Sequence, residues 1–146
     1  MTDGILIPTD GTRASANAIR HAVNLAVAHD ATLYPLHVID EELSEVYDGE
    51  GLEATLEETG ENAISEVRDL AESASVEVET AIREGTPHQE IIAYADEIDV
   101  DTIVVGTKER TGEDRQLLGS VTDRVARGAN EPVTIVKTPA LDGDDS

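Results

Sequence analysis

A stretch of 23 residues near the C-terminal end, residues 101–123, combines residue types that could bind an anion. The apolar run Ile103-Val104-Val105 ends on Gly106, and a polar loop follows until Gly119. Three consecutive β-branched residues predict a strand that is buried on both faces of a parallel sheet. A glycine at its end predicts a sharp turn, because a Cβ would clash there.

The residues after Gly119 predict the start of a helix. Ser120 stands three residues before Asp123, which is the Ser-x-x-Asp pattern of a helix N-cap. The N–H groups of Val121 and Thr122 would then lie at the positive end of the helix dipole and could bind an anion such as phosphate. Two simpler interpretations remain: Ser120 could be only a cap, and Gly106 only the end of a strand.

Other patterns that could carry chemistry are weak. The chain lacks cysteine, which excludes thiolate metal sites, and its four histidines show no ligand spacing. It has no Gly-x-x-x-x-Gly-Lys-Ser/Thr loop. The pattern Gly49-x-Gly51-x-x-Ala54 imitates a dinucleotide fingerprint, but it follows no predicted strand, so we interpret it as a loop. We assign no catalytic residue, and we interpret His37 as a strand residue that is packed or hydrogen-bonded.

The charge balance limits the partners of the protein. The 146 residues include 32 Asp and Glu against 10 Lys and Arg, a net charge of −22, so nucleic acid and anionic membranes are not expected partners. The chain could be an acidic disordered segment or a folded halophilic protein. We favour the halophilic interpretation, because acidic residues are spread along periodic apolar segments. The sequence shows no signal peptide and no apolar run of about 20 residues, so we expect a soluble, cytoplasmic protein.

The apolar periodicity predicts strands and helices in alternation. Pro35 is awkward inside a central strand and indicates a bulge, while the acidic residues 40–60 predict a long loop or a frayed helix start. The predicted strands are 4–8, 32–39, 76–82, 103–105 and 132–137. The predicted helices are 13–29, 63–74, 87–98 and 120–130, the last with Val121, Val125 and Ala129 on one side and Asn130 as its left-handed end.

This order predicts an α/β fold, an open doubly wound five-stranded parallel sheet with helices on both faces. We expect one domain over residues 1–137 and a flexible acidic tail over 138–146. Ligands of such sheets bind beyond the carboxyl ends of the strands, where the winding reverses. If the reversal lies between the first and fourth strands, residues 8–11 and 106–120 face each other.

The spacing of Gly106, Gly119 and Ser120 resembles the nucleotide loop of the universal stress protein family. Further landmarks match in order: Ile5-Leu-Ile-Pro-Thr-Asp-Gly11, His37-Val-Ile-Asp40, Gly85-Thr-Pro87 and Pro132-Val-Thr-Ile-Val-Lys137. The resemblance spans residues 4 to 137. It implies a compact Rossmann-like domain of the adenine nucleotide alpha hydrolase-like type, which is usually a homodimer and in many members binds ATP.

The resemblance also implies roles for individual residues. Asp10, after Pro8 and Thr9, would contact the ribose or the metal end of ATP, and its link to Mg²⁺ would be indirect, since the protein is expected to hold no metal of its own. The backbone of Val38 would contact adenine. The phosphates would be surrounded by Gly106, Lys108, Gly119, Ser120, Val121 and Thr122. From the residues alone, Asp10 could equally be part of an Asx turn.

One position departs from the family loop, because Glu109 stands where the family has its second glycine. A carboxylate there lies close in sequence to the expected phosphate site, although Lys108, Arg110 and Arg115 could offset its charge. Three functions therefore stay open. The protein could be an ATP-binding switch or sensor, a slow Mg²⁺-dependent ATP hydrolase that uses Asp10, or a dimer module that Glu109 prevents from binding ATP.

The last predicted strand suggests how two copies could meet. Val133 to Val136 are apolar and would lie at a sheet edge, where unpaired backbone groups can pair with a second copy. The resemblance implies the same homodimer. The alternative is an edge strand that Pro132 and Lys137 protect from pairing.

Overall fold

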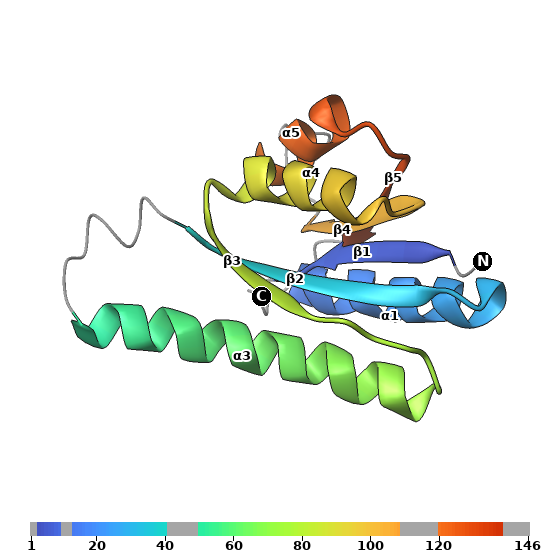
Figure 1. The fold of residues 1–146 in the computed structure, drawn as a ribbon, viewed down its shortest axis with the longest axis horizontal. Coiled ribbons are helices and arrows are strands. Elements are labelled where there is room, and N and C mark those ends of the chain that lie inside the picture. The colour runs from blue at the N-terminus through green and yellow to red at the C-terminus, as the bar shows by residue number, and fades with distance from the viewer. Residues whose placement is uncertain (1–2, 10–12, 41–49, 109–119, 139–146) are drawn as a thin grey trace, which may run out of the picture.

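The computed structural model describes residues 3–9, 13–40, 50–108 and 120–138, in which five parallel strands alternate with helices (Figure 1). The strand order is β3-β2-β1-β4-β5, so the winding reverses between β1 and β4 as expected. The predicted doubly wound α/β fold is confirmed. The elements are β1 (Gly4–Pro8), α1 (Arg13–His29), β2 (Thr32–Asp40), α3 (Glu50–Ser73), β3 (Ala81–Gly85), α4 (Pro87–Ile98), β4 (Thr102–Lys108), α5 (Ser120–Gly128) and β5 (Val133–Thr138).

The helices form two layers, with α1 and α3 on one face of the sheet and α4 and α5 on the other (Figure 1). Side chains of β1 alternate between these layers. Ile5 and Ile7 pack with α1 and α3, whereas Leu6 packs with α4 and α5, and all three are almost completely buried. The central strand therefore contributes to both apolar cores.

Pro35 interrupts hydrogen bonding between β2 and β3 without a bulge. Leu33 pairs with Val78, and three residues further along each strand Leu36 pairs with Ala81, so no residue is inserted. Leu33 exchanges hydrogen bonds with the β3 side, so by alternation Pro35 faces the same side, where it has no N–H to donate. This gap explains why the strand predicted over 76–82 begins only at Ala81.

Three helices end in the same left-handed motif. In each, a residue with positive φ is followed by an N–H that donates to the carbonyl five residues back, which closes the last turn. The positive-φ residues are Asp30 (53°), Ser75 (60°) and Asp99 (53°). The bonds are Ala31 to Ala26 (2.9 Å), Val76 to Ala71 (2.8 Å) and Val100 to Ala95 (3.3 Å).

The fourth predicted helix does not end in this way. α5 ends at Gly128, and Asn130 is not among the residues with positive φ, so the expected left-handed end at Asn130 is wrong. Its side chain instead donates to the carboxylate of Asp96 on α4, with Nδ2 to oxygen distances of 3.2 and 3.3 Å.

The sequence left residues 40–60 open between a long loop and a frayed helix start, and from residue 50 onward the structure shows a helix, because α3 begins at Glu50. Two glycines and several acidic residues within this helix made it difficult to recognise from the sequence. Gly60 has a packing reason: a Cβ there would lie 2.5 Å from Cδ2 of His37 on β2. Close approach of the helix to this ring outweighs the low helix propensity of glycine.

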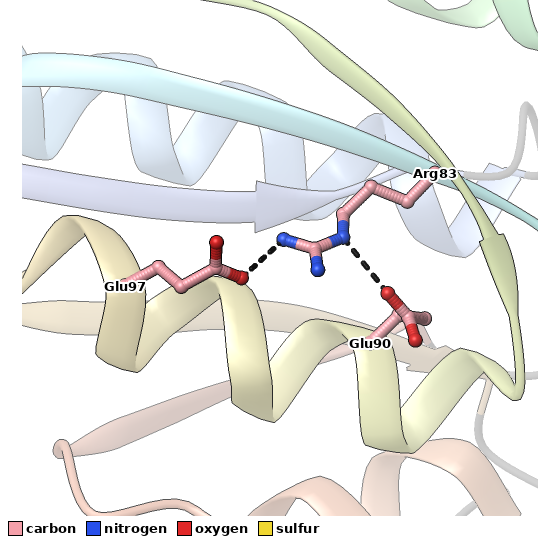
Figure 2. Close-up of polar contacts among 3 residues, drawn as sticks. All are labelled: Arg83, Glu90 and Glu97. Atoms are coloured by element: carbon pink, nitrogen blue, oxygen red, sulfur yellow. Dashed lines mark hydrogen bonds and ion pairs between the residues drawn. The ribbon is translucent and has the colours of Figure 1, made fainter.

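Arg83 on β3 connects the sheet to α4 (Figure 2). Its Nε lies 2.8 Å from Oε1 of Glu90, and Nη1 bonds to the carboxylate of Glu97, about two turns further along the same face of the helix. The guanidinium also lies 5.4 Å from the ring centroid of Tyr94. The hydrogen bond with Glu97 raises the pKa of Arg83, as does the bond with Glu90.

Candidate functional site

β1 and β4, the two strands that flank the reversal, stop pairing with each other before their carboxyl ends. Among the described residues, β1 and β4 pair at Ile5↔Thr102 and Leu6↔Ile103, although β1 stays paired with β2 as far as Pro8. By alternation Pro8 faces β4, since Thr9 donates to Leu36 of β2. Pro8 has no N–H, so it cannot extend the ladder toward β4. The chain itself therefore ends the pairing at the point where a ligand is expected.

Gly106 lies on the β4 side of this opening, but not as a turn. β4 continues to Lys108, and Gly106 pairs with Val136 of β5, so the sharp turn expected at Gly106 is wrong. The carbonyl of Gly106 accepts a hydrogen bond from the hydroxyl of Thr122, at 3.3 Å. This bond ties the first turn of α5 to β4 beyond its last pair with β1.

The N-cap expected at Ser120 stays a prediction, because α5 is described from Ser120 onward and residue 119 lies outside the described residues. Both carboxylate oxygens of Asp123, three residues further on, accept from Nε of Arg127, at 3.0 Å. N–H groups in the first turn of a helix still have no acceptor within the helix. The anion site expected at this helix start stays a prediction, since Gly119 lies outside the described residues.

The first turn of α5 has one buried and two exposed side chains. Thr122 is only 6% exposed, whereas Val121 is 39% exposed and Ser120 is also exposed. The expected packing of Val121 on the helix's apolar side is therefore wrong, although Val125 is buried and Ala129 packs against the same core. A β-branched threonine that bonds through its hydroxyl is difficult to distinguish in sequence from a solvent-exposed one.

The segment that leaves β1 is held by β2. Thr9 is buried, its N–H donates to the carbonyl of Leu36 at 2.9 Å, and its own carbonyl lies 2.8 Å from Nδ1 of His37. The expectation that His37 is a packed, hydrogen-bonded strand residue is confirmed. Its contact with Thr9 was not predicted, because only the strand order shows that the ends of β1 and β2 are adjacent.

The other predicted site residues occupy the same carboxyl edge or lie outside the described residues. Val38 is half-buried on β2, and the backbone of Lys108 pairs with Thr138 at the end of β5. The side chain of Asn17 on α1 donates to the hydroxyl of Thr138 at 2.9 Å, which connects α1 to the end of β5. Asp10, Glu109 and Gly119 lie outside the described residues.

Comparison with known proteins agrees with this architecture. The model of the universal stress protein family matches residues 1–137. Universal stress protein MJ0531 of Methanocaldococcus jannaschii is 40% identical over 139 residues, which cover 92% of this chain and 82% of the relative. The chain belongs to the universal stress protein family. The family resemblance of the sequence is thereby confirmed.

Solved structures of universal stress proteins share the fold. MJ0577 of Methanocaldococcus jannaschii superposes with a TM-score of 0.78 at 30% identity, over 97% of this chain and 99% of that one. A universal stress protein in complex with cAMP superposes with a TM-score of 0.68 at 25% identity, over 93% and 97% of the two chains. Nucleotide binding therefore occurs among structural relatives of this universal stress protein.

Two further features of this universal stress protein concern metals and membranes. Across residues 3–9, 13–40, 50–108 and 120–138, no three His, Asp or Glu side chains lie close enough together to hold a metal ion. In the same part of the chain, no helix has the length and apolar character required to cross a bilayer.

Proposed function

We propose that this universal stress protein binds ATP with Mg²⁺ at the carboxyl edge of β1 and β4, and acts as a switch or sensor. The phosphates lie at the start of α5, against the backbone of Gly106, Gly119, Ser120, Val121 and Thr122 and near Lys108. The backbone of Val38 contacts adenine, and Asp10, which follows Pro8 and Thr9, contacts the ribose or the bound Mg²⁺. The nucleotide supplies the Mg²⁺, and the protein needs no metal of its own.

The observation that supports this proposal most directly is the bond between Thr122 and Gly106. It holds the start of α5 over β4 where Pro8 has ended the pairing with β1. A helix N-terminus at a topological reversal is a favourable site for phosphate, because unpaired N–H groups and the helix dipole act together. The structural relative in complex with cAMP supports an adenine nucleotide as the ligand.

Replacement of Thr122 by valine tests the proposal. Thr122→Val keeps the shape but removes the hydroxyl, so we expect Mg-ATP affinity to fall by about tenfold, the effect of one lost hydrogen bond that positions the donors. Thr102→Val is the matched control, since Thr102 also donates to a backbone carbonyl, that of Pro132 at 3.0 Å, but at the other end of β4. Calorimetry in molar KCl measures the Mg-ATP affinity of both variants and of the wild-type protein. Equal affinities for Thr122→Val and the wild-type protein contradict the proposed phosphate site.

A second candidate function is slow hydrolysis of ATP, with Asp10 acting through Mg²⁺. If the wild-type protein releases inorganic phosphate from ATP and Asp10→Asn does not, hydrolysis is supported. If the wild-type protein releases no more phosphate than buffer alone, hydrolysis is excluded. Asp123, the carboxylate in the first turn of α5, is paired with Arg127, so it is not available as a free general base. The switch or sensor function therefore takes precedence.

A third candidate is a dimer module that does not bind ATP because of Glu109. A carboxylate beside the phosphates weakens binding by charge repulsion. Glu109→Gly removes this charge and restores the family's glycine, so tighter Mg-ATP binding by Glu109→Gly than by the wild-type protein identifies Glu109 as the cause. Unchanged or weaker binding shows that it is not.

The assembly and location are part of the same proposal. Two copies form a homodimer through the edge strand β5, whose residues Val133 to Val136 are only half-buried in one copy. The protein works in the cytoplasm of a salt-loving cell, because its net charge of −22 suits high ionic strength. Neither nucleic acid nor a membrane is a partner, since both repel such a surface.

A further inference from the structure

His37 connects three segments that are far apart in the sequence. Its side chain on β2 is only 8% exposed, and Nδ1 lies 2.8 Å from the carbonyl oxygen of Thr9, beyond the end of β1. The ring also packs against α3, where the ideal Cβ position at Gly60 is 2.5 Å from Cδ2 and 3.1 Å from Nε2. The histidine therefore lies between the exit of β1 and the helix that covers β2.

The hydrogen bond restricts the direction in which the chain leaves β1. A carbonyl oxygen can only accept, so Nδ1 of His37 carries the hydrogen. The N–H of Thr9 is also bonded, to the carbonyl of Leu36 at 2.9 Å, so β2 holds both peptide units that flank Thr9. Because a peptide unit is planar, fixing the Thr9 carbonyl fixes the plane that leads into Asp10.

Gly60 determines where the ring of His37 can lie. A separation of 2.5 Å is shorter than side-chain Cβ atoms tolerate, so any larger residue at Gly60 must displace the ring or the helix. The ring is confined between the backbone of α3 and the Thr9 carbonyl. Displacement of the ring breaks the hydrogen bond, because such bonds weaken steeply with distance and angle.

We propose that His37 is a positioning residue for the nucleotide site, acting through the Thr9 carbonyl, and that Gly60 sets the place of its ring. This inference rests on the proposed function, in which Asp10 contacts the ribose or Mg²⁺. His37 does not touch the nucleotide. It holds the segment that carries Asp10 in the orientation that binding requires, so that less of the binding free energy is lost in ordering this segment.

Four variants separate positioning from general stability. His37→Leu fills much of the space but removes the donor, and Gly60→Ala displaces the ring. His37→Asn is the conservative variant, because an asparagine amide nitrogen can replace Nδ1 as the donor. Val67→Ala is the control: it opens a space at the buried contact of α3 with the sheet, about two helical turns from Gly60.

Two measurements are made on each full-length variant, well below its Tm and in molar KCl. Hydrogen exchange of the amides of residues 9–12 without ligand reports how firmly the segment is held, and calorimetry gives the affinity for Mg-ATP. In His37→Leu and Gly60→Ala we expect faster exchange and about tenfold weaker affinity, the effect of one lost buried hydrogen bond. His37→Asn retains both properties within about threefold, and Val67→Ala lowers Tm without changing either.

The outcomes distinguish this inference from the proposed function. If the wild-type protein binds no Mg-ATP, the proposed function fails, and a positioning role for a nucleotide fails with it, whatever the exchange rates. If the wild-type protein binds and His37→Leu binds equally well, the proposed function stands and the inference is overturned. Equal losses in His37→Leu and Val67→Ala also overturn it, because they show that binding follows overall stability.

Discussion

Glu131, in the segment between α5 and β5, has a carboxyl oxygen in an unfavourable place. Its Oε1 is buried and has no hydrogen-bond partner. Burial raises the pKa of this carboxyl, and its hydrogen bond with Asp96 of α4 raises it further. Folding therefore disfavours the ionised form relative to the unfolded chain, so an ionised Glu131 reduces stability.

Replacement of Glu131 by glutamine removes this cost. An acid whose pKa is raised on folding stabilises the fold below its ordinary pKa of 4.5, and this contribution is lost as pH rises through the raised value. We expect Glu131→Gln to be more stable than the wild-type protein at pH 7 by roughly 1 kcal/mol, and the difference to shrink below pH about 4.5. Glu66→Gln, at an exposed position of α3, controls for loss of one negative charge. An equal gain in both variants at pH 7 contradicts the assigned cause.

Residue types predicted the region of the candidate site better than its contacts. β4 and the helix after Gly119 were recognisable in the sequence, whereas the polar loop predicted between them lies outside the described residues. Yet the bond of Thr122 to Gly106 and that of His37 to Thr9 join residues 16 and 28 positions apart. Sequence periodicity shows which face of an element is apolar, but not which backbone carbonyl lies opposite a given hydroxyl or imidazole.

At the scale of elements, one arginine attaches a whole helix to the edge of the sheet. Arg83 belongs to the edge strand β3, and its two carboxylate partners, Glu90 and Glu97, lie on α4 (Figure 2). In a chain of net charge −22, loss of this cation leaves two neighbouring carboxylates without a counter-charge. The contact is partly shielded from water, since the Arg83 side chain is 28% exposed.

Replacement of Arg83 by methionine is therefore expected to lower the free energy of unfolding by about 1 kcal/mol. Arg127→Met is the matched control, because Arg127 is 78% exposed and its pair with Asp123 lies within one helix. We expect that control to lose less than about 0.5 kcal/mol. Urea unfolding of both variants measures the difference, and equal losses mean that Arg83 acts as an ordinary surface ion pair.

Element boundaries were predictable wherever local chemistry determines them. Thr86 and Pro87 mark the start of α4, with proline in its first turn as expected. The sequence left the start of α3 undecided, because Gly51 and Gly60 both resemble loop residues, and the packing reason for Gly60 lies in His37 on another element. The late start of β3 likewise depends on Pro35 in another strand. Contacts between elements, rather than local propensity, decided these two cases.

For the whole molecule, the open edge of β5 suggests a test of the proposed homodimer. The carbonyl of Pro132 accepts from Ile103, so by alternation the N–H of Ile135 points away from β4. Ile135→Pro removes this outward donor and is expected to yield monomers. Ile135→Ala loses the same packing contacts but keeps the N–H, and should remain dimeric. Light scattering measures both masses, and a monomeric wild-type protein refutes the proposal.

The acidity of the chain leads to an expectation for its salt dependence. Repulsion among carboxylates is screened over about 10 Å at 0.1 M salt and about 3 Å at 1 M. We therefore expect Tm to rise substantially between these KCl concentrations, and NaCl of equal ionic strength to act similarly. Full stability in dilute buffer contradicts the halophilic interpretation.

β1 has only five residues, yet it supplies side chains to both layers of the molecule. Deletion or insertion of one residue within it would exchange Ile5 and Ile7 with Leu6 between the two faces, and would move Pro8 to the side that faces β2. Both packing layers and the opening toward β4 would be lost in a single event. Changes of chain length in this lineage should therefore accumulate in the connections between elements, and the spacing from Gly4 to Pro8 should stay constant.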